Sequence, residues 1–211
     1  SRSPLSRVMS ILEMIVEDYD SLKDNELKEI LSNAAKTSKS TYTLMENLLE
    51  WARLQTGKMN FAPQNISLTS LLSSIRDLYY QKLKEKDISL NFELEPEFFA
   101  YADQQMTETV LRNLISNAIK FTPEAGLIIV SLDSSGDDIL IKVKDTGVGM
   151  NENQVSKLFK LEMTHSKAGT SGERGTGLGL ILVKELVEKQ SGKIWVESEV
   201  NSGSAFFFTL P

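Results

Sequence analysis

Residues 1 to about 57 carry apolar side chains at intervals of three and four, the spacing of one face of an α-helix. A polar stretch, "KDNE" at residues 23–26, interrupts this pattern once. The sequence therefore predicts two long helices joined by a short polar loop, with Gly57 ending the second. The stripes are formed by Leu5, Val8, Leu12, Ile15, Tyr19 and Leu22, then by Leu27, Ile30, Ala34, Thr37, Thr41, Leu44, Leu48 and Trp51.

The apolar stripe of the second helix is wider than one helix–helix seam, because Leu31, Met45, Leu49 and Leu54 extend it. Two arrangements bury such a stripe: a four-helix bundle made by two copies of the hairpin, or packing of the hairpin on the domain that follows. The width of the stripe favours the homodimer. We expect a dimerisation hairpin over 1–60 and a second domain over 61–211.

From Pro63 onward, helical and strand patterns alternate along the chain. Helices are predicted over 67–86, 103–120, 151–159 and 177–190, with Ser67 or Thr69 capping the first of them. Strands are predicted over 88–94 and 98–101, and hairpins over 126–145 and 192–211, while 160–175 is irregular. Helices combined with mostly antiparallel strands indicate an α+β fold, a two-layer sandwich with the helices on one side of the sheet.

Charge and composition narrow the function. The formal net charge of -6 argues against a basic nucleic-acid groove or binding to an anionic membrane surface. The chain has no cysteine and one histidine, His165, which excludes disulfides and thiolate sites and leaves little for a zinc site or a serine-type triad. No apolar run is long enough to span a bilayer, so we expect a cytoplasmic chain with any membrane segment outside it.

The stretch "NLISNAIKFT", residues 113–122, carries the first candidate site. Asn113 and Asn117 are four residues apart on a predicted helix, and Lys120 lies one turn further along the same face. Two carboxamides and an ammonium on one stripe can hold a metal ion and phosphates. A solvated polar face is the alternative interpretation of this stripe taken alone.

The stretch "VKDTGVGM" places Asp145 at the end of a predicted strand, followed by Gly147 and Gly149. A carboxylate there can accept a hydrogen bond from an exocyclic amine, while the glycines leave room for a flat ring. A tight turn is the alternative interpretation, because Asp and Gly are common turn residues.

The stretch "GERGTGLGL" places Gly175, Gly177 and Gly179 just before a predicted helix. Bare backbone N–H groups at a helix start are suited to binding phosphate, although a glycine-rich turn alone is weak evidence. The sequence contains neither a GxxxxGK[ST] loop nor a βαβ unit, which excludes the P-loop and dinucleotide-binding classes.

In this order and at these intervals, the motifs resemble the ATP-binding domain of sensor histidine kinases of two-component systems, within the superfamily of gyrase and chaperone ATPases. "NLISNAIKFT" is similar to the N box, "DTGVGM" to the G1 box, Phe159 to the F box and "GTGLGL" to the G2 box. "SRSPLSRVM" is similar to the end of the phosphoacceptor motif, so the resemblance covers nearly the whole chain.

The resemblance implies ATP and Mg²⁺ as cofactors, and it implies roles for individual residues. Asp145 would accept the adenine amino group beside Gly147 and Gly149, Asn117 would ligate Mg²⁺, and Asn113 would support nucleotide binding. Lys120 would reach a phosphate, Phe121 would lie beside adenine, and residues 160–174 would form a lid. The residues expected to clamp the triphosphate are Arg174, Gly175, Thr176, Gly177, Leu178 and Gly179.

Asn113 also separates kinase from ATPase. Relatives that hydrolyse ATP carry a glutamate there as the base for water, and an amide cannot take that proton. The resemblance therefore implies transfer to a protein histidine and relay to a response regulator. A gyrase- or chaperone-type ATPase and a catalytically silent dimeric scaffold remain the alternatives.

In the resembled family, the phosphoacceptor histidine lies five residues before the proline that corresponds to Pro4. The position of that histidine falls upstream of Ser1. We therefore expect the acceptor to lie outside these 211 residues. His165, in the expected lid, is interpreted as an exposed loop histidine.

Overall fold

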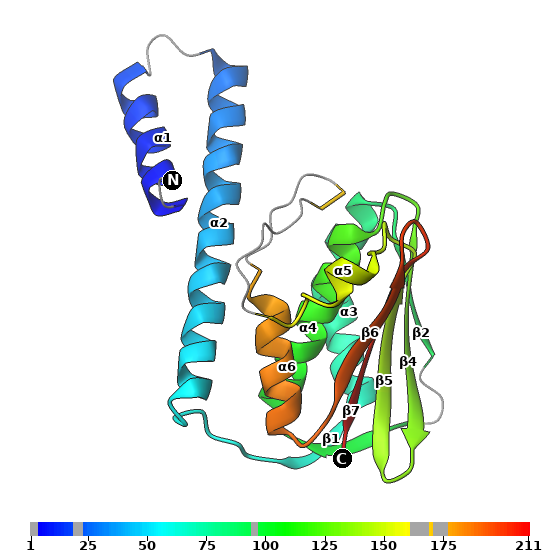
Figure 1. The fold of residues 1–211 in the computed structure, drawn as a ribbon. Coiled ribbons are helices and arrows are strands. Elements are labelled where there is room, and N and C mark those ends of the chain that lie inside the picture. The colour runs from blue at the N-terminus through cyan, green and yellow to red at the C-terminus, as the bar shows by residue number, and fades with distance from the viewer. Residues whose placement is uncertain (1–3, 19–22, 94–96, 161–168, 171–176) are drawn as a thin grey trace. The chain divides into compact units, whose positions relative to one another are not determined.

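The structure is a computed structural model that describes residues 4–18, 23–93, 97–160, 169–170 and 177–211. The chain divides into two compact units, Ser1–Ala52 and Arg53–Pro211 (Figure 1). No helix in the described ranges combines the length and hydropathy needed to cross a bilayer.

The first unit is the expected helical hairpin. It contains α1, Pro4–Asp18, and most of α2, Asp24–Gln55. The second helix starts earlier than predicted, because "KDNE" begins the helix instead of forming a loop. Leu27 N donates to Lys23 O at 2.9 Å, and Lys23 N donates to Glu26 Oε2 at 3.2 Å, so the first turn is already closed. Acidic Asp24 and Glu26 in that turn suit the positive end of the helix dipole.

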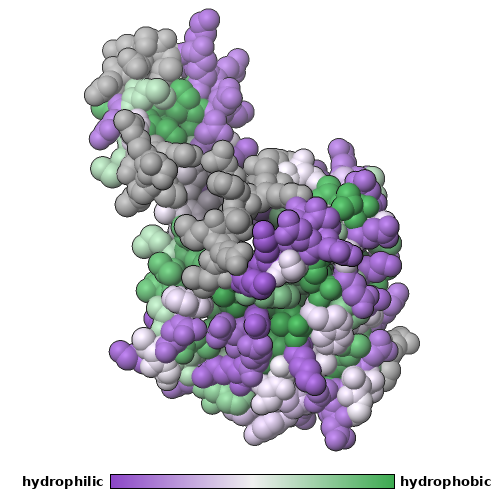
Figure 2. Space-filling model, viewed as in Figure 1, coloured by the Kyte–Doolittle hydropathy of each residue, from purple (hydrophilic) through white to green (hydrophobic). Residues whose placement is uncertain are grey.

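The hairpin leaves much of its apolar stripe uncovered. Ala34 is buried, whereas Leu31, Met45 and Leu49 are 47%, 56% and 57% exposed. Hydrophobic residues reach the surface of this unit in Figure 2. After α2, Gly57 adopts a left-handed φ of 66° and donates its N–H to Leu54 O, which ends the helix as predicted.

The second unit is built on a five-stranded sheet with the order β2-β4-β5-β7-β6. Its strands are β2, Ser89–Glu93; β4, Leu127–Ser135; β5, Asp138–Asp145; β6, Ile194–Glu199; and β7, Gly203–Leu210. Only β2 and β4 pair in parallel, and the other neighbours are antiparallel. A separate two-stranded sheet joins β1, Gln64–Ser67, to β3, Phe99–Ala102. Strand β1 was absent from the sequence prediction.

Three helices cover one face of the sheet (Figure 1): α3, Leu68–Glu85; α4, Gln104–Phe121; and α6, Gly179–Lys189. Leu72, Leu114 and Leu186, one from each helix, are fully buried in the core between the two layers. Ser67 caps α3 by accepting the Ser70 N–H, and Asp103 caps α4 by accepting the Met106 N–H. The predicted two-layer sandwich is confirmed.

Two predicted helices are shorter than expected. Helix α5 covers only Glu152–Val155, because Lys157 N and Leu158 N bond three residues back in place of four, which ends the α-helix. Helix α6 begins at Gly179 and not at 177, since Gly177 has a left-handed φ of 76° that a right-handed helix cannot contain.

A buried polar network connects the start of this unit to two of its helices. Asp103 Oδ2 accepts the Ala62 N–H at 2.9 Å, and the Asp103 N–H donates to Gln190 Oε1 at 3.0 Å. The same Gln190 oxygen accepts the Thr107 hydroxyl at 3.1 Å. The network joins residue 62, the N-terminus of α4 and the C-terminus of α6.

Candidate functional site

Helix α4 places the three polar residues of the first motif on one side, as predicted. Asn113, Asn117 and Lys120 are half-buried, while Leu111 and Leu114 on the opposite side are fully buried in the core. Asn113 Nδ2 donates to Thr109 O, one turn back, at 2.9 Å. This bond fixes the Asn113 carboxamide and turns its oxygen away from the helix backbone.

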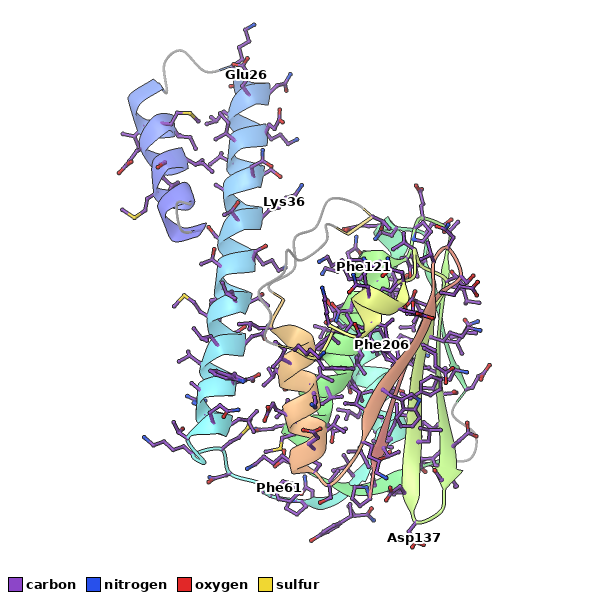
Figure 3. All side chains as sticks on the ribbon, in the orientation of Figure 1. Glu26, Lys36, Phe61, Phe121, Asp137 and Phe206 are labelled. Atoms are coloured by element: carbon purple, nitrogen blue, oxygen red, sulfur yellow. The ribbon has the colours of Figure 1, made fainter. Side chains whose placement is uncertain are left out.

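The last turn of α4 carries an aromatic ring beside a cation. Lys120 Nζ lies 4.6 Å from the centroid of the Phe121 ring, a cation–π distance. Figure 3 labels Phe121 at this end of α4. The Phe121 carbonyl accepts the Val148 N–H at 3.2 Å, so the loop after β5 is attached to the end of α4.

Lys86, which the sequence interpretation missed, closes the C-terminus of α4. Its ammonium donates to Ile119 O at 2.8 Å and to Lys120 O at 3.4 Å. It also donates to Thr170 Oγ1 at 2.7 Å, and Thr170 in turn bonds the carbonyls of Lys120 and Thr122. A cation there is favourable because the carbonyl end of a helix carries partial negative charge.

Asp145 ends β5, at the opposite end of that strand from the β4–β5 turn that carries Asp137 (Figure 3). Its side chain is only 3% exposed. The Oδ1 atom accepts the Gly147 N–H at 2.8 Å and the Ser204 N–H at 3.2 Å. Burial raises the pKa of the Asp145 carboxyl to about 6, and the two N–H donors limit that rise.

The β6–β7 hairpin holds the loop that follows Asp145. Gly149 has a φ of 62° and packs against the Glu199 carbonyl, so a β-carbon has no room there. Asn201 N donates to Val148 O at 2.9 Å, and Met150 N donates to Ser198 Oγ at 2.9 Å. These partners lie 48 or more residues from the loop, and sequence reasoning did not identify them.

Gly147 is equally restricted. A β-carbon at Gly147 would come within 2.6 Å of both the Asp145 carboxylate and the Phe121 carbonyl. This glycine therefore allows the strand end that carries Asp145 to approach the helix end that carries Phe121, and the structure brings these two predicted site residues together.

The third motif meets the first at the start of α6. A β-carbon at Gly179 would lie 2.7 Å from Asn113 Oδ1, so the first residue of α6 lies against the carboxamide on α4. Leu178 precedes the helix and supplies no side-chain hydrogen bond as a cap. Helix α5, by contrast, has a complete capping box formed by Asn151 and Gln154.

Some predicted residues cannot be placed. Arg174, Gly175 and Thr176 lie outside the described residues, as do His165 and Lys167 of the expected lid. Phe159 is described, and it is half-buried in the turn after α5.

The site suits a metal ion brought by a phosphate ligand. Among the described residues, no group of three or more His, Cys, Asp or Glu side chains comes together to form a metal site. Amide oxygens remain as the protein groups that could ligate a metal ion. Mg²⁺ characteristically uses few protein ligands, together with several waters and substrate phosphates. The half-buried Asn117 on the same stripe as Asn113 fits that limited role.

Comparison with known proteins identifies the family to which a site of this kind belongs. Residues 102–211 match the family described as histidine kinase-, DNA gyrase B-, and HSP90-like ATPase. The sensor histidine kinase WalK of Bacillus subtilis is 32% identical over 213 residues, which cover 100% of this chain and 34% of WalK. The autoinducer 2 sensor kinase/phosphatase LuxQ of Vibrio vulnificus is 28% identical over 218 residues, covering 100% of this chain and 25% of LuxQ. The chain thus spans between a quarter and about a third of these relatives.

Solved structures agree with the sequence relatives. The catalytic domain of histidine kinase ThkA matches with a TM-score of 0.61 at 30% identity, covering 72% of this chain and 96% of that domain. The Acinetobacter baumannii histidine kinase AdeS matches in fold with a TM-score of 0.77 over 99% of this chain and 95% of AdeS, at 20% identity. The chain belongs to the histidine kinase-, DNA gyrase B- and HSP90-like ATPase family, whose members bind ATP, and within that family to the sensor histidine kinases.

Proposed function

We propose that this chain is the kinase core of a two-component sensor, and that it binds Mg-ATP and transfers the γ-phosphoryl group to a histidine. We place this activity in the cytoplasm, where ATP is available. The observation that carries the proposal is the close approach of Gly179 at the start of α6 to the Asn113 carboxamide on α4, where a β-carbon would lie 2.7 Å from Oδ1. This approach combines helix N–H groups with amide oxygens in one place, as a metal-bound triphosphate requires.

At the base end, Asp145 would accept the adenine 6-amino group. Both hydrogen bonds that it receives from described residues reach Oδ1, which leaves Oδ2 to accept from a ligand. Guanine has a carbonyl at the corresponding position, and a carboxylate cannot donate to it. Phe121, at the end of α4, would lie beside the base.

At the phosphate end, the start of α6 would bind the triphosphate through backbone N–H groups. Lys120 would reach a phosphate oxygen, and Asn117 would hold Mg²⁺, which neutralises phosphate charge when bound. Arg174, Gly175 and Thr176 belong to the same proposal through the motif that they share with Gly177, Leu178 and Gly179.

Transfer to protein is favoured over hydrolysis because Asn113 cannot act as a base for water. In the transfer, an imidazole nitrogen forms a bond to the γ-phosphorus as the bond to the β–γ bridging oxygen breaks, and ADP leaves. Catalysis then depends on positioning and charge, which α4 and the start of α6 would supply.

The helical unit would form a homodimer through its uncovered apolar stripe, in which Met45 and Leu49 are 56% and 57% exposed. A response regulator would then receive the phosphoryl group. A solved complex of histidine kinase ThkA with the response regulator protein TrrA supports this partner class, since ThkA matches the fold over 100% of this chain with a TM-score of 0.75.

The experiment is labelling with γ-labelled ATP and Mg²⁺, using the 211-residue chain alone and, in parallel, mixed with a dimerisation hairpin that carries a phosphoacceptor histidine. The added hairpin is expected to acquire acid-labile, base-stable label, and the 211-residue chain is expected to bind ATP in calorimetry. His165→Ala should leave the label unchanged, while Asp145→Asn should reduce it.

Two outcomes would replace the proposal. Phosphate release without protein label would indicate an ATPase of the gyrase or chaperone kind. Failure to bind ATP at all would indicate a silent dimeric scaffold.

A further inference from the structure

Ser198, on β6, is paired across the sheet with the strand that supports Asp145. The register aligns Ser198 with Ser204 on β7, and Ser204 with Asp145 on β5. The three residues therefore form one row across three strands. Ser204 N donates to Asp145 Oδ1 at 3.2 Å, so the middle residue of the row holds the carboxylate directly.

The Ser198 hydroxyl uses its full hydrogen-bonding capacity. It accepts the Met150 N–H at 2.9 Å, donates to the Gly203 carbonyl at 2.9 Å, and lies 3.0 Å from the Ser204 hydroxyl. A hydroxyl has one hydrogen and two lone pairs. Because Gly203 O can only accept, the Ser198 hydrogen is used there, and Ser204 must donate its own hydrogen to the remaining lone pair.

One hydroxyl thus acts on both ends of the loop that begins at Asp145. It holds Met150 directly, and it holds Asp145 through Ser204. Without it, the Met150 N–H and the Ser204 hydroxyl both lose this partner, and the backbone N–H groups of Ser204 and Gly147 still reach Asp145 Oδ1, but from a residue and a loop that are held less firmly.

We propose that Ser198 is a positioning residue that sets the orientation of Asp145 and thereby the preference of the site for a base with a 6-amino group. This inference rests on the proposed ATP-binding function. Ser198 acts through Ser204 and Met150 and makes no contact with the nucleotide. Its removal should weaken recognition of the amino group more than binding of the triphosphate.

The test compares two ligands that differ only at the 6-position of the purine. ATP and purine riboside triphosphate, which lacks the 6-amino group, are titrated into the 211-residue chain with Mg²⁺ by calorimetry. The preference is the dissociation constant of purine riboside triphosphate divided by the dissociation constant of ATP. Ser198→Ala is expected to reduce this ratio by roughly three- to tenfold, the effect of losing about one hydrogen bond.

Two variants serve as controls. Ser198→Thr keeps the hydroxyl on a strand-favouring side chain and is expected to retain the wild-type ratio. Ser202→Ala removes a hydroxyl that is exposed in the same β6–β7 turn, and it is also expected to retain the ratio. Should Ser198→Ala fail to fold, Ser198→Cys supplies a weaker hydrogen-bonding group of similar shape for the same comparison.

Asp145→Asn separates this inference from the proposed function. If Asp145→Asn reduces the ratio and the Ser198 variants do not, Ser198 is only structural and the inference is wrong. If the Ser198 variants weaken both ligands equally, the inference is wrong for the same reason. If Asp145→Asn leaves the ratio unchanged, Asp145 does not recognise the base, and both proposals fail together.

Discussion

Gly179, the first residue of α6, lies so close to Asn113 on α4 that an added β-carbon would come within 2.7 Å of the carboxamide oxygen. The two residues are 66 positions apart in the sequence, yet each limits the space that the side chain of the other can occupy. The carboxamide cannot move aside freely, since Asn113 Nδ2 is bonded to Thr109 O at 2.9 Å.

Gly179→Ala should therefore weaken ATP binding by at least about tenfold without lowering thermal stability to the same degree. Alanine favours the helix by about 1 kcal/mol over glycine, whereas its β-carbon displaces the Asn113 carboxamide. Calorimetry and thermal unfolding measure the two effects. In a double-mutant cycle, Asn113→Ala should make the Gly179→Ala change nearly harmless to binding, and strict additivity would contradict the contact.

Asp145→Asn should stabilise the ligand-free chain at pH 7.5, by roughly 1–3 kcal/mol. The pKa of the Asp145 carboxyl is raised by burial from its ordinary value of 3.8 to about 6 in the folded state, so the folded state binds more protons between these values and loses stability as the pH rises through about 6. Asn keeps an oxygen that accepts from Gly147 and Ser204. Thermal unfolding of the two proteins from pH 4 to 8 should show the advantage of Asn vanishing at pH 4, and a constant difference would exclude burial as its cause.

ATP affinity should fall as the pH is lowered below about 6, because the ionised Asp145 carboxylate is the form that accepts the adenine amino group. One pH unit below the pKa leaves about a tenth of the groups ionised, so the expected loss is roughly tenfold at pH 5. Titration of the ATP phosphates contributes equally to wild type and Asp145→Asn, which makes that variant the control. Parallel pH profiles for the two proteins would refute the assignment.

Leu49→Glu should dissociate the proposed homodimer. Leu49 is 57% exposed on α2, and burying one leucine stabilises by about 1.5–3 kcal/mol, twice over in a symmetric dimer. The dissociation constant should rise at least about a hundredfold in analytical ultracentrifugation. Leu78→Glu is the matched control, since Leu78 on α3 is 56% exposed and should not affect association. A dimer that survives Leu49→Glu would indicate a different interface.

The parts of the fold that could be predicted are those with a local signal. Ser67 indicates the start of α3, because a serine at the N-cap accepts an N–H from a residue three positions later in the sequence. The position of Asn113 and Asn117 on one side of α4 follows from helical periodicity. Strand β1 has four residues with no apolar alternation, and it exists because β3 pairs with it. Helix α5 stops early through i→i+3 bonds that its composition does not reveal.

The candidate site divides in the same way. Asp145 and its glycines are visible in the sequence because one strand end and one turn contain them. Ser198 and Ser204 are not, since they reach the loop only through the registers of three strands. Lys86 is an ordinary surface lysine by sequence, and only the meeting of α3 with the end of α4 gives it its carbonyl partners. The depth of Asp145, and therefore its raised pKa, also depends on tertiary packing.

The Asp103 network has a mechanical consequence. Ala62 is bonded to the Asp103 carboxylate, and the Asp103 backbone is bonded to Gln190, with Thr107 sharing the same oxygen. A force applied to the chain at residue 62 therefore loads the N-terminus of α4 and the C-terminus of α6 together. These helices carry Asn113 and Gly179, so a displacement of the backbone at residue 62 would reach both residues of the candidate site through this one set of hydrogen bonds.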